Sequence, residues 1–182
     1  MKADRVGLPS DGLGFVRREC PHCHRQFKVR NGPNDGGTVH RQLNRYLLLA
    51  NHEELHRGQE ELYCVYCGRA ALSDDWCTPQ QRAWIEKLAD VLAKEIRFEQ
   101  LAWPSRTLRD NPAPTYVPVP PSDRLPEMRR EPDDMRRASF ICCVEEVKVE
   151  SHWTQPVYCP SCGAEHQNGS RHIRLEVMLA EA

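Results

Sequence analysis

Apolar residues recur at helical spacing in two stretches of the chain. In the first, from Thr38 to His56, the apolar residues fall on one helical face and Gly58 follows as a stop signal; they are Val39, Leu43, Tyr46, Leu47 and Ala50. This pattern predicts a helix over residues 38–56.

The second helical stretch is longer and amphipathic. Thr78, Pro79 and Gln81 provide the residue types of a capped helix start: an N-cap, a first-turn proline and a capping-box partner. An apolar stripe follows, flanked by charged residues: Trp84, Ile85, Leu88, Val91, Leu92 and Ile96. Pro104 interrupts the pattern, so we predict a helix over residues 78–103, roughly 36 Å long.

Outside the two helical stretches, the sequence contains short segments typical of β-strands. Phe15-Val16 and Phe27-Lys28-Val29 predict strands, and turn-forming residues follow at 31–37. Residues 1–14 contain three glycines and one proline and predict a flexible arm. Near the other end of the chain, alternating apolar residues predict a half-buried strand: Ile173, Leu175, Val177 and Leu179.

Eight of the nine cysteines form pairs close to the β-like segments. Three pairs have C-x-x-C spacing and the fourth is adjacent: Cys20/Cys23, Cys64/Cys67, Cys159/Cys162 and Cys142/Cys143. Two residues between cysteines is the spacing of a zinc knuckle, in which the chain turns so that both thiolates reach one metal. We therefore predict structural zinc, with a rubredoxin-like iron site as the less favoured alternative. The remaining cysteine, Cys77, is predicted to pack in or near the core.

The two halves of the chain repeat each other. Phe27-Lys28-Val29 begins four residues after Cys23, and Val147-Lys148-Val149 begins four residues after Cys143. The closing knuckles also match, since residues 62–68 read LYCVYCG and residues 157–163 read VYCPSCG. Such self-similarity predicts two copies of one unit, each made of a knuckle, a β-hairpin, a second knuckle and a strand.

The repeat supplies a complete set of four metal ligands only in the first copy: Cys20, Cys23, Cys64 and Cys67. In the second copy Phe140 aligns with Cys20, which leaves Cys143, Cys159 and Cys162. Cys142 is the favoured fourth ligand because a thiolate matches its partners, and His152 is the alternative. Two further alternatives stay open: the second copy binds metal through three ligands, or it binds no metal.

Composition agrees with small metal-stabilised units rather than one large core. The 182 residues are 40% hydrophobic and 28% charged and include 14 prolines. Small ribbons bury too little apolar surface to fold alone, so metal binding must supply stability. A net charge of −1 gives no overall basic field for nucleic acid. With no signal-like pattern at residues 1–10 and no apolar run of about 20 residues, we expect a cytoplasmic protein that does not enter membranes.

Eight prolines between Pro104 and Pro132 predict an extended linker over residues 104–138. The favoured interpretation is a spacer between the two copies. The alternative is a tether that lies across a partner or across the chain's own helix, through Tyr116, Val117 and Val119.

Residues 52–56 read HEELH and match H-E-x-x-H, in which two histidines bind zinc and the glutamate activates water. The charged Glu54 and Arg57 do not suit the extended motif, and Gln59 stands where metzincins require glycine. A solvated helix end is therefore favoured over a metallopeptidase site formed by His52, Glu53 and His56.

A local basic face beside Phe27 makes nucleic acid an alternative partner: Arg17, Arg18, Arg25, Lys28 and Arg30. The competing interpretation is a solvated face compensated by Glu19 and Asp35.

The knuckles Cys20-x-x-Cys23, Cys64-x-x-Cys67-Gly68 and Cys159-Pro-x-Cys162-Gly163 resemble those of the zinc-ribbon superfamily. The duplication is similar to that of a double zinc-ribbon protein of bacterial type. The resemblance covers residues 15–71 and 139–179. It implies structural zinc and an adaptor role in binding protein or nucleic acid, not catalysis, and it names no partner.

Together these patterns predict a small α+β protein in five parts. They are a flexible arm (1–14), a first zinc ribbon (15–77) with its helical insert (38–56), an amphipathic helix (78–103), a Pro-rich linker (104–138), and a second ribbon with a terminal strand (139–182). We expect two zinc sites and a non-catalytic adaptor that binds a protein partner. Nucleic-acid binding and an H-E-x-x-H metallopeptidase are the alternatives, and the oligomeric state is left open.

Overall fold

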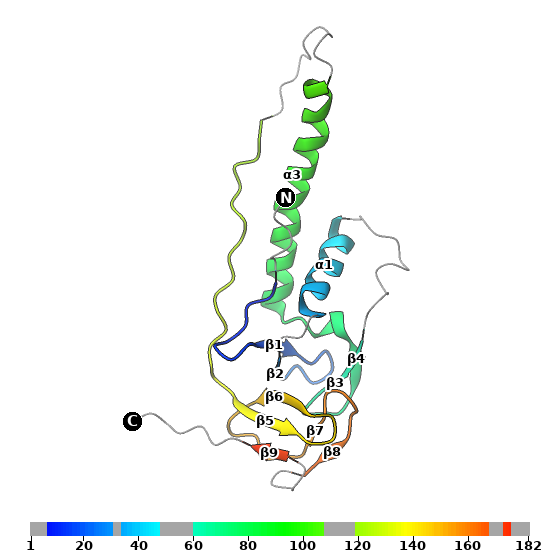
Figure 1. The fold of residues 1–182 in the computed structure, drawn as a ribbon, viewed down its shortest axis with the longest axis vertical. Helices are drawn as coiled ribbons and strands as arrows, with labels where there is room; N and C mark the ends of the chain where they lie inside the picture. The colour runs from blue at the N-terminus through cyan, green and yellow to red at the C-terminus, as the bar shows by residue number, and fades with distance from the viewer. Residues whose placement is uncertain (1–6, 31–33, 48–59, 108–118, 168–172, 176–182) are drawn as a thin grey trace, which may run out of the picture.

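The structure is a computed structural model that describes residues 7–30, 34–47, 60–107, 119–167 and 173–175. It is a small α+β fold in which short antiparallel strands form a body, and one long helix projects from that body (Figure 1). The elements in chain order are β1 (Phe15–Glu19), β2 (Gln26–Arg30), α1 (Asn34–Leu47), β3 (Glu61–Tyr63), β4 (Ala70–Leu72), the 3-10 helix η2 (Ser73–Trp76), α3 (Pro79–Thr107), β5 (Arg136–Phe140), β6 (Glu145–Val149), β7 (Val157–Tyr158), β8 (Glu165–His166) and β9 (Ile173–Leu175).

The largest sheet joins the two halves of the chain. Its strand order is β1-β2-β6-β5-β9, so the hairpins β1–β2 and β5–β6 lie side by side. Lys28 on β2 pairs with Lys148 on β6, and these two lysines occupy the same place in the sequence repeat. Because each lysine faces its own counterpart across an antiparallel pair, an approximate two-fold axis relates the two units.

Each unit adds a smaller hairpin, β3–β4 in the first and β7–β8 in the second. All four knuckles lie at the tips of hairpins, whereas the sequence predicted a knuckle before each hairpin. The two small hairpins exchange backbone hydrogen bonds: Tyr63 N–H donates to Pro160 O at 2.9 Å, and Tyr158 N–H donates to Val65 O at 3.0 Å. Tyr63 matches Tyr158 in the sequence repeat, and Val65 matches Pro160, so each bond is the counterpart of the other. The two bonds therefore obey the same two-fold relation.

Two glycines allow the small hairpins to approach closely. Gly68 has φ +67° and Gly163 has φ +70°, in the left-handed region that glycine enters without steric cost. A Cβ on Gly68 would lie 2.8 Å from the Tyr158 ring, and a Cβ on Gly163 would lie 2.8 Å from the Tyr63 ring. Each glycine is therefore needed both for its backbone conformation and for the tyrosine of the other unit.

We expect Gly68→Ala to lower the free energy of unfolding by about 3 kcal/mol, because left-handed strain and overpacking each cost about 1–2 kcal/mol. Gly14→Ala is the matched control, since Gly14 also has positive φ (+83°) but no atom within 4 Å of a built Cβ. Chemical denaturation of the zinc-loaded variants measures both losses. Equal losses would show that the tyrosine contact between the units contributes nothing.

The main core lies between the two units and takes buried residues from both: Phe27, Val65, Trp76, Ala138, Phe140, Val147, Val149 and Val157. Phe27 is its centre, because its ring meets the Trp76 ring edge-on at 5.5 Å and the Tyr66 ring at 6.2 Å. The buried Cys20, Cys64 and Cys159 belong to the same cluster, so the knuckles border this core.

Helices α1 and α3 pack together beside the first unit. Their buried residues form a second cluster with Leu8 and Val16: Val39, Leu43, Ile85, Leu88 and Ala89. The predicted capping box at the start of α3 is confirmed, since Thr78 N–H donates to Gln81 Oε1 at 2.9 Å and Gln81 N–H donates to Thr78 Oγ1 at 3.2 Å.

Both helix boundaries differ from the prediction. Helix α1 begins at Asn34 instead of Thr38, so the glycines predicted as a turn occupy its first turn, where helix propensity matters least. Residues 48–56 of the predicted helix lie outside the described residues. Helix α3 continues to Thr107, three residues beyond Pro104, because a proline in the last turn removes only one helical hydrogen bond.

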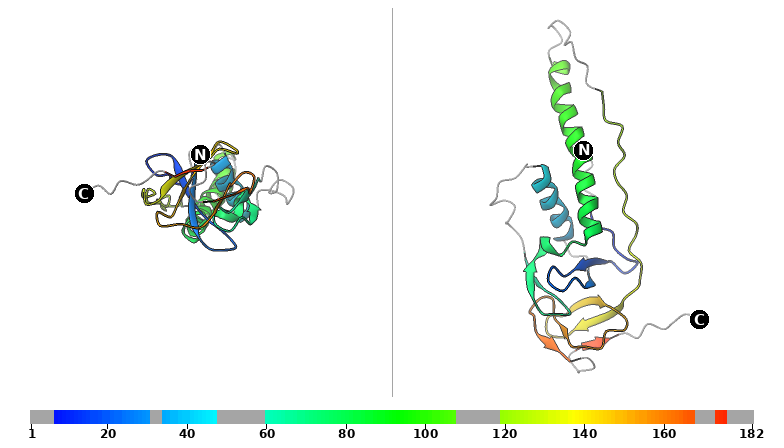
Figure 2. Two further views of the ribbon diagram at one scale, coloured as in Figure 1. Left: turned by 90° about the horizontal axis from the view of Figure 1, so that it is seen from below. Right: turned by 180° about the vertical axis from the view of Figure 1, so that it is seen from behind.

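Residues 119–135, which we call the strap, run in an extended conformation alongside α3 (Figures 1 and 2). Trp84 Nε1–H donates to Pro126 O at 2.8 Å, and Lys94 Nζ lies 2.6 Å from Asp123 Oδ2. This part of the linker thus lies on the chain's own helix, although Val119 itself is 82% exposed. Tyr116 and Val117 lie outside the described residues, and β5 begins at Arg136 rather than at residue 139.

Candidate metal centres

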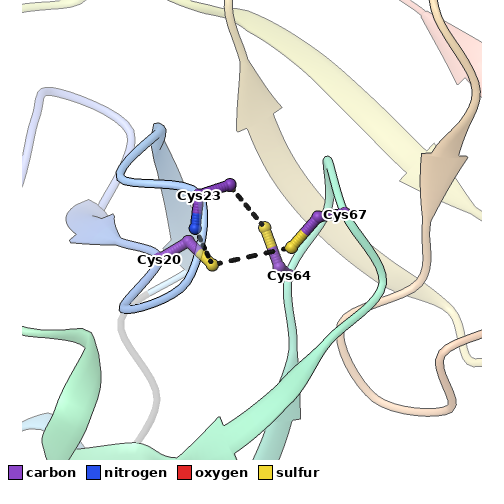
Figure 3. A group of neighbouring side chains, drawn as sticks. All are labelled: Cys20, Cys23, Cys64 and Cys67. Carbon is purple, nitrogen blue, oxygen red and sulfur yellow. Dashed lines mark hydrogen bonds between the residues drawn. The ribbon is translucent and has the colours of Figure 1, made fainter.

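The first cysteine group gathers the tips of two hairpins. Cys20 and Cys23 lie in the turn between β1 and β2, and Cys64 and Cys67 lie in the turn between β3 and β4 (Figure 3). Cys20 Sγ is 3.7 Å from Cys67 Sγ, and Cys23 Sγ is 3.7 Å from Cys64 Sγ. All four sulfurs lie within 4.8 Å of one another.

This spacing fits zinc. Four sulfurs at about 2.3 Å from a tetrahedral zinc ion stand about 3.8 Å apart, close to the observed separations. A complete set of four sulfur ligands also leaves no coordination position for water or substrate, as in structural zinc sites. The residues present can therefore hold zinc, whose contribution would be to fix the two hairpin tips to each other.

Backbone N–H groups of the first group point at two of its sulfurs. The N–H groups of His22 and Cys23 donate to Cys20 Sγ, and the N–H of Tyr66 donates to Cys64 Sγ, each at 3.4 Å. His24, directly after Cys23, has φ +57°, the left-handed conformation that closes the knuckle. Backbone N–H donors stabilise thiolates, so this turn prepares the cysteines for a cation.

The thiols do not ionise together without a cation. Burial raises the pKa of Cys23 to about 11, and burial also raises the pKa of Cys64 well above its usual range. In the second group, burial and the thiols of Cys159 and Cys162 raise the pKa of Cys142 to about 12. Metal binding must therefore displace protons, and a divalent cation offsets the repulsion among four thiolates.

The second group brings together Cys142, Cys143, Cys159 and Cys162, whose sulfurs also lie within 4.8 Å of one another. Cys142 Sγ lies 3.8 Å from Cys162 Sγ. Phe140 stands in the backbone position of Cys20, as the alignment indicates, and its ring is buried in the core. Two adjacent cysteines therefore face one centre, which is the arrangement that the sequence favoured over His152.

The structure places His152 outside this group. Its imidazole side chain is 86% exposed, and Nε2 lies 3.5 Å from Glu150 Oε2. The side chain beside the group is instead His166 on β8, whose Nε2 lies 3.4 Å from Cys142 Sγ. His166 is not among the residues that the sequence predicted for this centre. Alignment of the closing knuckles gives a signal for it, because this histidine replaces Ala71 of the first unit.

The two groups differ in how well they are covered. Cys20 and Cys64 are buried and Cys23 and Cys67 are half-buried in the first group. In the second group only Cys159 is buried, whereas Cys142 and Cys162 are exposed. The same donor set is therefore sheltered in one unit and open to solvent in the other.

The basic face predicted around Phe27 is wrong. Phe27 and Lys28 are buried, with exposed fractions of 1% and 0%, and Arg18 is also buried. The reason is that successive side chains of β2 point to opposite faces: Phe27 packs in the core between the two units, and carboxylates of Asp11 and of the strap lie against Lys28 on the other face. The remaining three arginines of this face meet carboxylates: Arg17 with Glu131 and Asp134, Arg25 with Glu150, and Arg30 with Glu146.

Lys28 and Lys148 instead form the buried centre of an ionic cluster. Lys148 Nζ donates to Asp11 Oδ2 at 2.7 Å and to Asp133 Oδ1 at 2.5 Å, and Lys28 Nζ lies 2.8 Å from Asp134 Oδ1. Burial acts to raise the pKa of Asp11, but hydrogen bonds from Lys148 and from two backbone N–H groups outweigh it and hold the pKa below its ordinary value. The end of the strap is therefore anchored where the two units meet.

The ninth cysteine, Cys77, belongs to neither metal centre. Cys77 is fully buried in the cluster of the two helices, where burial raises the pKa of its thiol. His52, Glu53 and His56 lie outside the described residues. Among the described residues, no helix has the length and apolar character needed to cross a membrane.

The chain matches no protein-family model, and comparison with curated proteins and with solved structures finds no match either.

Proposed function

We propose that this chain is a non-catalytic adaptor of the zinc-ribbon type, in which two zinc-stabilised units hold a rigid surface for a protein partner. Cys20, Cys23, Cys64 and Cys67 would bind one zinc ion, and Cys142, Cys143, Cys159 and Cys162 the other. Because both donor sets are complete, neither zinc ion offers an open position for a substrate. The metal would act on folding, and recognition would fall to side chains at the hairpin tips.

The observation that supports a protein partner is the apolar tip of the β5–β6 hairpin. Ile141 is 61% exposed and Val144 is 89% exposed, on either side of the two adjacent cysteines. These residues border a surface depression of about 570 Å³ that reaches the buried Phe140 ring. Exposed apolar side chains around a concave surface are typical of protein contact sites.

Val144 also has an unfavourable backbone conformation. Its φ is +55°, which is unusual for a β-branched residue and costs about 1 kcal/mol or more. His24, at the matching position of the first unit, has φ +57° but is a residue type that enters this region more readily. A strained, solvent-exposed valine adds nothing to the packing of the fold, which is consistent with a role in contacting a partner.

The charges around this tip favour protein over nucleic acid. Glu145 and Glu146 line the depression, and the nearby Arg30 is engaged by Glu146 at 2.8 Å. Such a rim repels phosphates, whereas nucleic-acid sites require cations that are free to contact the backbone.

Site-specific photo-crosslinking tests the proposal. A photoreactive amino acid at position 144 should capture a protein, and the same amino acid at position 119, where Val119 is 82% exposed, should capture none. Adding Ile141→Ser should reduce the adduct at position 144. Val144→Asn should weaken partner binding while raising the free energy of unfolding by about 1 kcal/mol, because asparagine tolerates the left-handed backbone. Equal capture at both positions, or capture of nucleic acid at position 144, would overturn the proposal.

A further inference from the structure

The two cysteine groups share one donor set but offer solvent different access. Cys20 and Cys64 have no exposed surface in the first group. In the second group Cys142 and Cys162 are both exposed, and they come from different hairpins. Thiolates react with oxidants according to their exposure and ionisation, so the second group is the place where oxidation can begin.

The exposed pair is also placed to form a disulfide. Cys142 Sγ and Cys162 Sγ are 3.8 Å apart, and bonding requires them to approach to about 2.05 Å. The neighbouring residues at the β5–β6 tip, Ile141 and Val144, are themselves exposed, so this tip can shift without opening the core. In the first group a comparable approach would move the fully buried Cys20, which packs in the main core cluster.

His166 holds one member of the pair in position. Its Nε2 contacts Cys142 Sγ at 3.4 Å, and its ring packs against the Phe140 ring with centroids 5.4 Å apart. His166 as a whole is only 9% exposed, so it provides a fixed contact to Cys142, which is itself exposed and lies 3.8 Å from Cys162 Sγ.

We propose that the second metal centre is a peroxide-reactive zinc–thiolate site, in which Cys142 and Cys162 are oxidised to a disulfide with loss of the zinc ion. This inference rests on the zinc sites of the proposed function. One exposed thiolate attacks a peroxide oxygen, the O–O bond breaks, and a sulfenic acid and one water form after a proton is taken from solvent. The other thiolate then attacks the sulfenic sulfur, the S–S bond forms, the S–O bond breaks, and the hydroxide leaves as a second water.

The electrons of this reaction balance, and the number of remaining thiolates explains why the zinc ion is lost. Two thiolates supply the two electrons that reduce one hydrogen peroxide to two waters, with two protons taken from solvent. Only Cys143 and Cys159 then remain as thiolate ligands, which is too few to retain zinc in a tetrahedral site. Oxidation would thus change the β5–β6 tip that carries Ile141 and Val144, while leaving the first centre in place.

Zinc release from the wild-type protein provides the test. Protein with two zinc ions per chain is treated with hydrogen peroxide, and released zinc is followed with a chromogenic chelator. One zinc ion per chain should appear at least about tenfold faster than the other, because reactivity follows exposure. Peptide mapping should then find a Cys142–Cys162 disulfide, and a dithiol reductant with added zinc should restore the second ion. Equal release of both ions, or a disulfide within the first group, would overturn the inference.

Two variants sharpen this result. Cys77→Ser is the matched control, because Cys77 belongs to neither group, and it should leave the fast phase unchanged. Cys162→Ser should abolish the fast phase, either by retaining a second zinc ion that peroxide no longer releases or by purifying with only the slowly released ion. A fast phase that persists in Cys162→Ser contradicts the inference.

The outcomes separate this inference from the proposed function. If the purified chain binds fewer than two zinc ions per chain, the zinc module of the proposed function itself fails. If two ions bind and are released together, only the peroxide-reactive site fails. If crosslinking at position 144 finds no partner, the adaptor role fails while the difference between the two centres remains measurable.

Discussion

Removal of zinc by a strong chelator is expected to unfold the body of this protein. The small hairpins contain strands of only two or three residues, which cannot hold the knuckles together by themselves. Structural zinc supplies about 10–16 kcal/mol in small zinc modules, which is as large as the whole stability of a typical domain. Trp76 reports on this change, because its ring is fully buried against Phe27. The tryptophan fluorescence of the chain, to which Trp76 contributes, should shift to the red as the far-ultraviolet dichroism of the folded state is lost.

Cys64→Ser should give the same result without a chelator, because it removes a buried ligand of the first centre. Cys77→Ala is the matched control: this cysteine is equally buried but lies outside both groups, and its loss should cost only about 1 kcal/mol. A chelator that removes both zinc ions yet leaves the melting temperature and the tryptophan spectrum unchanged would contradict the role assigned to the metal.

The grouping of the cysteines was predictable because it depends on short-range information. Two residues between cysteines dictate a tight turn, and the repeat shows which knuckles belong to the same unit. The repeat also placed Phe140 against Cys20 and so drew attention to Cys142, which the structure brings into the second group. Each closing knuckle is followed by a glycine in the sequence, and both of these glycines, Gly68 and Gly163, have positive φ.

The joining of the two units was not predictable from the same pattern. Lys28 looks solvent-facing in sequence, because a lysine between apolar strand residues is usually exposed. Only the pairing of β2 with β6 places it beside Lys148, under carboxylates that lie more than 100 residues from Lys28 along the chain. The predicted nucleic-acid face failed for this reason: local charge does not show which distant segments will cover a strand. His166 was missed for a similar reason, since its partner Cys142 is distant in sequence.

Lys148→Met is expected to destabilise the zinc-loaded protein by about 3 kcal/mol, which is the lower end of the usual cost of breaking a buried ion pair. Lys148 Nζ donates to Asp11 at 2.7 Å, and the Asp11 side chain is fully buried. Without Lys148 this carboxylate keeps Lys28 as a cation 3.8 Å away, so its charge is only partly compensated. Denaturant unfolding at a fixed zinc concentration measures the decrease in the free energy of unfolding.

Lys94→Met is the control for this variant. Lys94 also pairs with an aspartate of the strap, Asp123 at 2.6 Å, but both side chains are largely exposed, so the change should alter stability little. A loss equal to that of Lys148→Met would mean that the strap contact matters, rather than the burial of the charge.

The pH dependence follows from the sign of the Asp11 shift. Because the folded pKa of Asp11 lies below its ordinary value of 3.8, its ionised form contributes stability that is complete above that value and is lost as the pH falls through the folded pKa. The cost of Lys148→Met should therefore stay constant between about pH 6 and about pH 8, where Asp11 is ionised in both the folded and the unfolded chain. A cost that disappears within this range would show that Asp11 takes up a proton near neutral pH, and that a hydrogen-bonded carboxylic acid rather than an ion pair joins Asp11 to Lys148.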